Sequence, residues 1–451
     1  MITKEEKRRQ MLENPVEKLV CTMAVPTIIT MMITALYNMA DTYFVGQLDT
    51  ISTAAVGLAL PLMNVVQALG FFFGHGSGNY MSAKLGAGDS KAADTMGDTA
   101  AVLSLISGGI IAAAGLLFIH PMCILLGATE LLMEKTTEYI SVLLIGVPFM
   151  MSSFTMNNQL RFQGSAFLGM IGMGVGSVLN VGLDPLFIYV FDMGVKGAAL
   201  ATVVSQIISF MILLKMGGRL PLRKPFFKLT GAIALSILKF GTPSLARQGI
   251  MSVAAIYLNN AAGAYSEAVI AAVSVVNRIV MLGASVIIGL GQGFQPVCGF
   301  NSGAERYDRV KKSYLFCLRL STGFMAVFGL LSFIFAPSLV AFFRDDPEVI
   351  AAGTPLLRYQ CITSVFQGMI VMTNMILQNM GKTVRASILA VARQGLFFIP
   401  LLHILTKYWG LHGLTLTQSA ADLLTAIVTA PMMIIMLREL DKACSRSSSL
   451  C

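Results

Sequence analysis

Long apolar stretches follow one another along the whole chain and are separated by short polar segments. Each stretch reaches the roughly 20 residues that an α-helix needs to cross the hydrocarbon core of a bilayer. The pattern predicts an all-α integral membrane protein with twelve spans, near residues 19–46, 52–80, 95–118, 136–157, 166–191, 196–216, 233–262, 267–299, 313–338, 353–377, 384–406 and 411–437.

The same residue types recur at a constant offset in the numbering, which indicates an internal duplication. Most of the recurring residues are Pro or Gly, which mark bends and close backbone contacts. The pairs at an offset of 217 include Pro26 with Pro243, Gly74 with Gly291, Gly76 with Gly293, Asn157 with Asn374 and Gly164 with Gly381, and near the ends of the halves Gly194 and Gly410 match at an offset of 216. An even number of spans in each half lets both halves enter the membrane in the same direction, so we predict two parallel six-helix repeats around a central cleft.

Helix-breaking and charged residues divide the chain into four predicted parts. The segment 217–232 contains Gly, Pro and basic residues and is predicted to be a cytoplasmic linker. An N-terminal six-helix bundle over 1–216 precedes it, and a C-terminal six-helix bundle over 233–437 follows it. Residues 438–451 are expected to form a cytoplasmic tail.

Composition and charge support a membrane location. Hydrophobic residues make up 55% of the 451 residues and charged residues only 12%, against about 25% charged in an average soluble domain. If the N-terminus is cytoplasmic, the inner segments hold most Lys and Arg, including Arg161, and the outer loops hold only Lys135, Lys196, Arg344 and Lys407. This bias predicts a multi-pass protein of the cytoplasmic (inner) membrane with both termini inside. The net charge of +9 reflects the same bias and does not indicate a nucleic-acid partner.

No pattern in the chain indicates a cofactor or an enzymatic centre. The seven cysteines lack paired spacing and are expected to be free thiols, and the four histidines lack metal-ligand spacing. Gly381-Lys382-Thr383 resembles the end of a P-loop, but Ile376 stands where the earlier glycine is required, so no ATP site is predicted. The loops are too short to gather catalytic groups, as a membrane transferase would require. Uphill work would therefore be driven by an ion gradient.

Two acidic residues lie deep inside predicted spans and form the candidate coupling site. With a rise of about 1.5 Å per helical residue, Asp41, Asp184 and Thr202 fall at a similar level in the outer half of the membrane. Tyr37 precedes Asp41 by four positions and Asn180 precedes Asp184 by four, so each shares a helix face with its carboxylate. Buried carboxylates beside neutral oxygen donors make either a proton site or a Na⁺ site, and no other metal is expected.

The second half does not repeat this acidic pair. Leu258 and Leu401 occupy the positions that correspond to the two aspartates at the offset of 217, so the predicted ion site belongs to the first half. Asp422 is the other deep acid, and we expect it to neutralise Arg393 on the preceding span.

Proline and glycine residues also predict where helices bend and where they pack. Pro26 lies on the same helix as Asp41, four turns away, where a kink could respond to a change of charge at Asp41. Gly70, Gly74 and Gly78 lie on one face of the second predicted span and are expected to be a helix-packing surface.

The chain carries the motifs Ala24-Val-Pro-Thr-Ile-Ile29, Tyr37-Asn-Met-Ala-Asp-Thr-Tyr-Phe-Val-Gly46, Ala54-Ala-Val-Gly57 and Lys84-Leu-Gly-Ala-Gly88, and their pattern recurs after Phe240-Gly-Thr-Pro243. The resemblance that they carry covers essentially the whole chain. Here the chain resembles the multidrug and toxic compound extrusion (MATE) transporters, in the DinF/MepA-like bacterial branch that keeps its coupling acids in the first bundle. The resemblance implies two six-helix bundles around a cleft that opens alternately to either side. It also implies export of varied, often cationic and amphipathic compounds in exchange for H⁺ or Na⁺.

The resemblance also assigns roles to individual residues. It implies the bent-helix proline at Pro26, coupling carboxylates at Asp41 and Asp184, their partners at Asn180 and Thr202, and first-bundle cavity residues at Tyr37, Tyr139 and Asn157. Another branch of the family carries essential acids in the seventh and tenth helices, and the corresponding spans here contain none. That half instead carries Arg247 and Arg278, which would favour an anionic or zwitterionic substrate if they face the cleft and would mean nothing if they snorkel or pair.

The sequence thus predicts a secondary active multidrug efflux antiporter that works by alternating access. Its expected partners are small-molecule substrates and the lipid bilayer, and a monomer is expected to function because one chain holds both halves of the cleft. The alternative is a flippase or exporter of a lipid-linked precursor, which extra helices and a lipid-sized charged cleft would favour.

Overall fold

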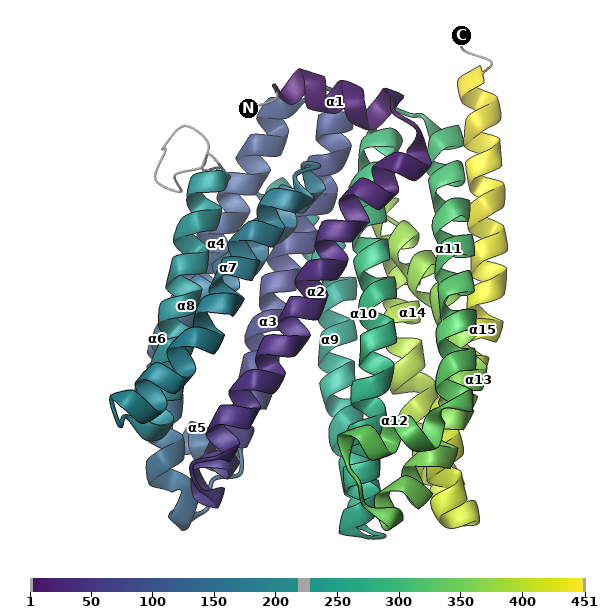
Figure 1. Ribbon diagram of the computed structural model, residues 1–451. Helices are drawn as coiled ribbons and strands as arrows, with labels where there is room; N and C mark the ends of the chain where they lie inside the picture. The colour runs from purple at the N-terminus through teal and green to yellow at the C-terminus, as the bar shows by residue number, and fades with distance from the viewer. Residues whose placement is uncertain (1–2, 218–227, 449–451) are drawn as a thin grey trace. The chain divides into compact units, whose positions relative to one another are not determined.

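The structure is a computed structural model that describes residues 3–217 and 228–448, apart from the side chains of residues 35, 38–42, 50, 447 and 448. Most of the predicted linker 217–232 and the last residues of the predicted tail lie outside the described residues. Every regular element within those ranges is a helix (Figure 1), which confirms the predicted all-α fold.

The first repeat consists of six long helices and two short ones. The long helices are α2 (Val16–Gly46), α3 (Thr50–Gly86), α4 (Ser90–Leu117), α6 (Glu130–Phe162), α7 (Ala166–Pro185) with its π-helical continuation η1 (Leu186–Val190), and α8 (Gly194–Met216). The short helices are α1 (Lys4–Glu13) before the repeat and α5 (Ile119–Leu125) between α4 and α6.

The second repeat follows the same order. Its elements are α9 (Gly231–Gly263), α10 (Glu267–Gly303), α11 (Tyr307–Ile334), the short α12 (Ala336–Phe343), α13 (Pro347–Asn379), α14 (Thr383–Val391), η2 (Ala392–Phe398) and α15 (Ile399–Ser448). Two helices are joined within α15 at Gly410, whose φ is 54°. If α15 is divided at Gly410, its first part continues α14 and η2 as one long helix, and its second part is a separate helix. The described ranges then contain twelve long helices, in agreement with the predicted number.

Corresponding backbone features confirm the duplication. The helices α3 and α10 each have 37 residues and begin at Thr50 and Glu267, which match at the same offset as the recurring glycines. Asp49 caps α3 by accepting a hydrogen bond from the backbone N–H of Ser52, and Ser266 caps α10 by accepting one from Val269. The hydroxyl and backbone N–H of Ser52 lower the pKa of Asp49. The first turn of this helix is therefore specified in both repeats by a side-chain cap.

Glycine is required at two further pairs of corresponding positions because the backbone there is left-handed. Gly164 has a φ of 74° and Gly381 a φ of 73°, and both lie between two long helices. Gly194 and Gly410 have φ angles of 52° and 54° and open the last helix of each repeat. Side chains with a Cβ rarely adopt this conformation, which explains why these glycines recur in the sequence.

Two compact units divide the structure, and their boundary does not follow the linker. The first unit comprises Met1–Lys7 and Ile29–Leu245, and the second comprises Arg8–Ile28 and Ala246–Cys451. Consequently α2 passes from the second unit to the first after Ile28, and α9 passes from the first to the second after Leu245. Pro26 and Pro243 each lie shortly before such a passage.

The exchanged half-helices dock on recurring glycines. A Cβ atom added to Gly293 on α10 would lie 2.5 Å from Cα of Ala24 on α2, and one added to Gly76 on α3 would lie 2.6 Å from the carbonyl oxygen of Ile237 on α9. Real Cβ atoms essentially never approach other atoms closer than 3.0 Å. Only glycine allows these backbones to pack so closely, and corresponding glycines of α3 and α10 receive the crossing helix in the two units.

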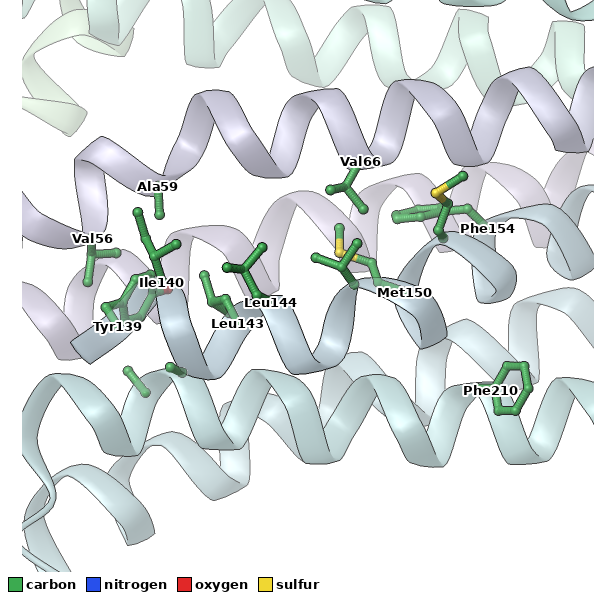
Figure 2. Packing of buried hydrophobic residues seen from close by; sticks show 14 of the residues in the cluster. Val56, Ala59, Val66, Tyr139, Ile140, Leu143, Leu144, Met150, Phe154 and Phe210 are labelled. Atoms are coloured by element: carbon green, nitrogen blue, oxygen red, sulfur yellow. The ribbon is translucent and has the colours of Figure 1, made fainter. Parts of the chain in front are cut away.

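The core of the first unit lies where α6 packs against its neighbours. Figure 2 shows Val56 and Val66 of α3 and Ile140 and Leu144 of α6 in this buried cluster, to which α8 adds Phe210. The predicted glycine stripe on α3 is confirmed as a packing surface: Gly70, Gly74 and Gly78 lie against Phe154, Asn158 and Phe162 of α6. A corresponding cluster in the second unit includes buried residues of α10, α13 and α15.

Replacing Gly108 with alanine is expected to destabilise the first unit, because the new Cβ would lie 2.6 Å from Cα of Pro148 on α6. Overpacking of this kind typically costs about 1–3 kcal/mol. The neighbouring Gly109 is the matched control, since nothing lies within 4 Å of its Cβ position and helix propensity alone favours alanine there. Thermal unfolding of the purified variants in detergent should show a lower Tm for Gly108→Ala only; equal Tm values would contradict this packing.

Candidate ion site in the first unit

Asp184 is fully buried near the end of α7, with no exposed side-chain surface. Asn180, one turn earlier on the same helix, donates from Nδ2 to Oδ1 of Asp184 at 3.4 Å. The same amide nitrogen lies 3.3 Å from Oγ1 of Thr202 on α8. The structure therefore brings together three of the five residues predicted for the coupling site and places them between α7 and α8.

The backbone changes character directly after the carboxylate. Pro185 follows Asp184 and ends α7, and the chain continues as the wider π-helix η1. Single π-helical turns within α-helices occur frequently at functional sites. The wider helix changes the direction in which the following side chains point. Asp184 is therefore the last residue that shares a face of α7 with Asn180.

Asp41 lies on α2, but its side chain is outside the described part of the chain. Two contacts of α2 with the α7–η1 segment bracket its backbone position. A Cβ added to Gly174 would lie 3.9 Å from Cδ1 of Ile33, and the Tyr189 hydroxyl donates to the carbonyl oxygen of Phe44 at 2.7 Å. Asp41 lies between Ile33 and Phe44 on α2, as Asp184 lies between Gly174 and Tyr189, so the two backbones are at about the same level. A shared site of the two carboxylates stays a prediction, as does the role of half-buried Tyr37, one turn before Asp41.

Sequence reasoning missed further oxygens on the same side of α8. Oε1 of Gln206 and Oγ of Ser205 are buried and have no hydrogen-bond partner among the described residues, and neither has Oδ1 of Asn180. Gln206 lies one turn after Thr202, so its four-residue spacing was the signal that could have revealed it. Buried acceptors without donors are unfavourable unless a ligand or proton satisfies them.

This arrangement can neutralise a single positive charge. It offers carboxylate, amide and hydroxyl oxygens, which are the ligands that hard cations prefer, and the carboxylate can equally accept a proton. Within the described ranges, no group of three or more His, Cys, Asp or Glu residues is arranged to hold a metal ion. The chemistry of the site therefore suits H⁺ or Na⁺ and does not distinguish between them.

The residues predicted for a substrate cavity have different environments. In the first unit, Tyr139 is 5% exposed within the hydrophobic core (Figure 2), and Asn157 donates to the carbonyl oxygen of Gly169 at 3.0 Å. In the second unit, Arg247 is half-buried and Arg278 is exposed. Whether any of them contacts a substrate stays a prediction.

Asn157 makes a contact that the duplication repeats. Its counterpart Asn374 donates to the carbonyl oxygen of Ala386 at 2.6 Å, and Ala386 corresponds to Gly169. Each amide therefore fixes the C-terminal part of one long helix, α6 or α13, to the start of the next helix, α7 or α14. This structural contact explains why asparagine recurs at the two positions.

A buried cluster around Arg161 is a second feature that the sequence did not predict. We expected Arg161 beyond the end of a span, but α6 continues to Phe162 and the side chain is only 2% exposed. Its Nη2 donates to Oδ1 of Asn158 at 2.5 Å and lies 3.1 Å from Nε2 of His75. The polar run Asn157–Arg161 and its helical spacing were the available signals, although a single sequence does not show that His75 on α3 faces them.

A duplicated helical bundle with carboxylates buried inside it is the architecture of a secondary membrane transporter. The chain belongs to the MatE family, whose profile matches residues 26–186 and 243–404. This match confirms the resemblance drawn from the motifs. The protein is accordingly a multi-pass membrane transporter and not an enzyme.

Known proteins resemble the chain over nearly its whole length. The multidrug export protein MepA of Staphylococcus saprophyticus is 28% identical over 428 residues, covering 93% of this chain and 94% of that protein. A solved structure described as a crystal structure of MATE in complex with MaL6 is 28% identical and superposes with a TM-score of 0.91, covering 96% of this chain and 99% of that one. A multidrug resistance MATE family transporter in an outward-facing conformation superposes with a TM-score of 0.89 at 28% identity and covers 96% of this chain and 98% of that one.

We predict that Asn157→Ala and Asn374→Ala lower stability by similar amounts, because each removes one hydrogen bond that joins two consecutive helices. The expected loss is about 0.5–1.5 kcal/mol for each. Asn277→Ala, at an exposed position of α10, is the control and should leave thermal unfolding unchanged. A variant Asn157→Ala with unaltered Tm but altered export would instead support a place in the substrate cavity.

Proposed function

We propose that the protein is a secondary active multidrug efflux antiporter, which exports amphipathic, often cationic compounds in exchange for H⁺ or Na⁺ by alternating access. The observation that carries the proposal is the fully buried Asp184 with Asn180 and Thr202 around it. A charged group in a membrane-spanning bundle is expensive unless a partner or bound ion neutralises it. An ion that binds here can therefore favour one conformation of the first unit over another.

The position of Asp41 supports a link between ion binding and the bending of α2. The helix runs without interruption from Val16 to Gly46 and changes unit after Ile28. Pro26, just before that passage, has no N–H with which to complete the helical hydrogen bond to the carbonyl of Thr22. Neutralisation at Asp41 would change the preferred course of the helix on one side of this weak turn, so Pro26 acts as the hinge.

The names of similar proteins support the proposed substrate class. MepA of Staphylococcus saprophyticus is a multidrug export protein, and the outward-facing structure belongs to a multidrug resistance transporter. We extend this property to the chain as varied amphipathic small molecules. Arg247 and Arg278 would favour an anionic substrate if they face the cleft. Anionic and cationic compounds therefore both belong in the assay.

The remaining parts of the proposal concern location and assembly. The Lys and Arg bias supports insertion in the cytoplasmic (inner) membrane with both termini in the cytoplasm. The two repeats within one chain support function as a monomer. An ion gradient replaces ATP as the source of energy, and no organic cofactor, resident metal or nucleic-acid partner has a role in the cycle.

Asp184→Asn is expected to abolish gradient-driven export while leaving the protein folded, because the amide is nearly isosteric but cannot exchange a charge. Proteoliposomes should be loaded with a fluorescent cationic dye and given first a pH gradient and then a Na⁺ gradient. The wild type should export the dye under at least one gradient, which identifies the ion, and the variant should fall to the rate of protein-free liposomes. Thermal unfolding reports whether the variant is folded.

Asp345→Asn provides the matched control, since it makes the same chemical change at an exposed acid. It should export at the wild-type rate. Full activity of Asp184→Asn would contradict the coupling role of this carboxylate. A wild type that exports no dye under either gradient would favour the alternative of a lipid-linked substrate.

Pro26→Ala is expected to stabilise the protein and to slow export. Alanine restores one helical hydrogen bond, worth about 0.5–1.5 kcal/mol, and thereby stiffens the proposed hinge. Ion binding should persist, seen as the same ion-dependent shift of thermal unfolding as in the wild type. The control is Pro61→Ala on α3, within a helix that stays in one unit; equal export by Pro26→Ala and the wild type would argue against a hinge.

A further inference from the structure

Asp422 in the second unit is a fully buried carboxylate whose neighbours differ from those of Asp184. Arg393 of η2 binds it with two nitrogens, Nε to Oδ1 at 2.7 Å and Nη2 to Oδ2 at 3.3 Å. Gln418, one turn earlier on α15, donates to Oδ1 at 2.8 Å, and Gln367 of α13 donates to Oδ2 at 3.4 Å. Both oxygens of the carboxylate thus accept two hydrogen bonds each, and its charge is neutralised by the chain itself.

The duplication places this ion pair in the region that corresponds to the candidate ion site. At the offset of 216 that relates the last helices of the two repeats, Gln418 corresponds to Thr202 and Asp422 corresponds to Gln206. Arg393 corresponds to Gly176 of the first repeat at the offset of 217. A Cβ at Gly176 would lie 1.8 Å from Oγ of Ser209, so that position has no room for any side chain.

We propose that Asp422 occupies a second monovalent-cation site whose cation is the resident guanidinium of Arg393, so that the second unit takes neither H⁺ nor Na⁺ from solution. The bidentate geometry supports this assignment, because a planar guanidinium satisfies both carboxylate oxygens at once. The two repeats then present one exchangeable and one permanently occupied site. That the site at Asp184 exchanges its ion rests on the proposed function, whereas the binding of Arg393 to Asp422 does not.

Other titratable groups on the packed elements have different positions or partners. On α14, Arg385 binds Glu439 at 2.9 Å. On α11, the Tyr314 hydroxyl bonds Thr373 at 2.8 Å. The buried thiols Cys317 of α11 and Cys361 of α13 make no hydrogen bond to Asp422 in the described structure. Arg393 is therefore the charged group that contacts Asp422 there.

Removing the resident cation should convert the site into one that responds to external ions. In Arg393→Met, the buried carboxylate loses its counter-ion and must bind a proton or Na⁺ to avoid an uncompensated charge. The test is thermal unfolding of purified protein, with pH varied in choline chloride and Na⁺ varied against choline at constant ionic strength. Performing it in an Asp184→Asn background removes the contribution proposed for the first unit.

The expected result is a Tm several degrees below that of the Asp184→Asn parent at pH 8 in choline chloride, with recovery on acidification, on addition of Na⁺, or on both. The two arms distinguish a proton from Na⁺. Adding Asp422→Asn should abolish the recovery, because no buried charge is left to neutralise. Absence of recovery in the Arg393→Met background, or recovery that survives Asp422→Asn, would overturn the proposal.

The doubly substituted Arg393→Met/Asp422→Asn protein in the otherwise wild-type chain provides a second test if Arg393→Met alone does not fold. It contains no charge at the site and should retain the wild-type ion dependence of thermal unfolding and of dye export. Loss of gradient-driven export by this folded variant would show that Asp422 is itself a coupling residue, contrary to the proposal. A wild type that exports no dye at all would count against the proposed function instead.

Discussion

Neutralising a buried carboxylate is the constraint on which the functional part of this fold depends. A charge buried inside either unit requires a counter-charge or hydrogen bonds supplied locally. The second unit meets this requirement with Arg393, which binds both oxygens of Asp422. In the first unit, the amide of Asn180 donates to Asp184 and also lies against the hydroxyl of Thr202. In our account, an exchangeable ion at this site provides the driving force.

Close packing fixes one end of each helix that passes from one unit to the other. Gly76 and Gly293 accept the backbone of a crossing half-helix, so α2 and α9 are each held in one unit at one end and continue into the other unit. Both helices carry a proline shortly before they change unit. The rigid parts are thus fixed by contacts that tolerate no Cβ, and the weakest helical turns occur where movement between two conformations would be absorbed.

Much of this organisation could be predicted from sequence because membrane insertion and duplication leave strong patterns. Span length, the recurring glycines and the i, i+4 spacing of Asn180 and Asp184 anticipated the helices and half of the site. Long-range placement was harder to predict. A single sequence does not show that α2 exchanges units after Ile28, that Arg161 is buried beside His75, or that Asn157 binds a backbone carbonyl, because each depends on which faces of distant helices meet. Gln206 was missed although its spacing from Thr202 places both on one face of α8, because spacing alone does not show that this face is buried.

If ion and substrate move in opposite directions through one protein, a gradient of either one must drive the other. Purified wild-type protein in liposomes should be given an outward gradient of a transported dye with no ion gradient, while an internal pH- or Na⁺-sensitive fluorophore is recorded. We expect the dye gradient to drive H⁺ or Na⁺ into the lumen against its own equilibrium. Dye efflux with no accompanying ion movement of either kind would contradict exchange and with it the proposed role of Asp184.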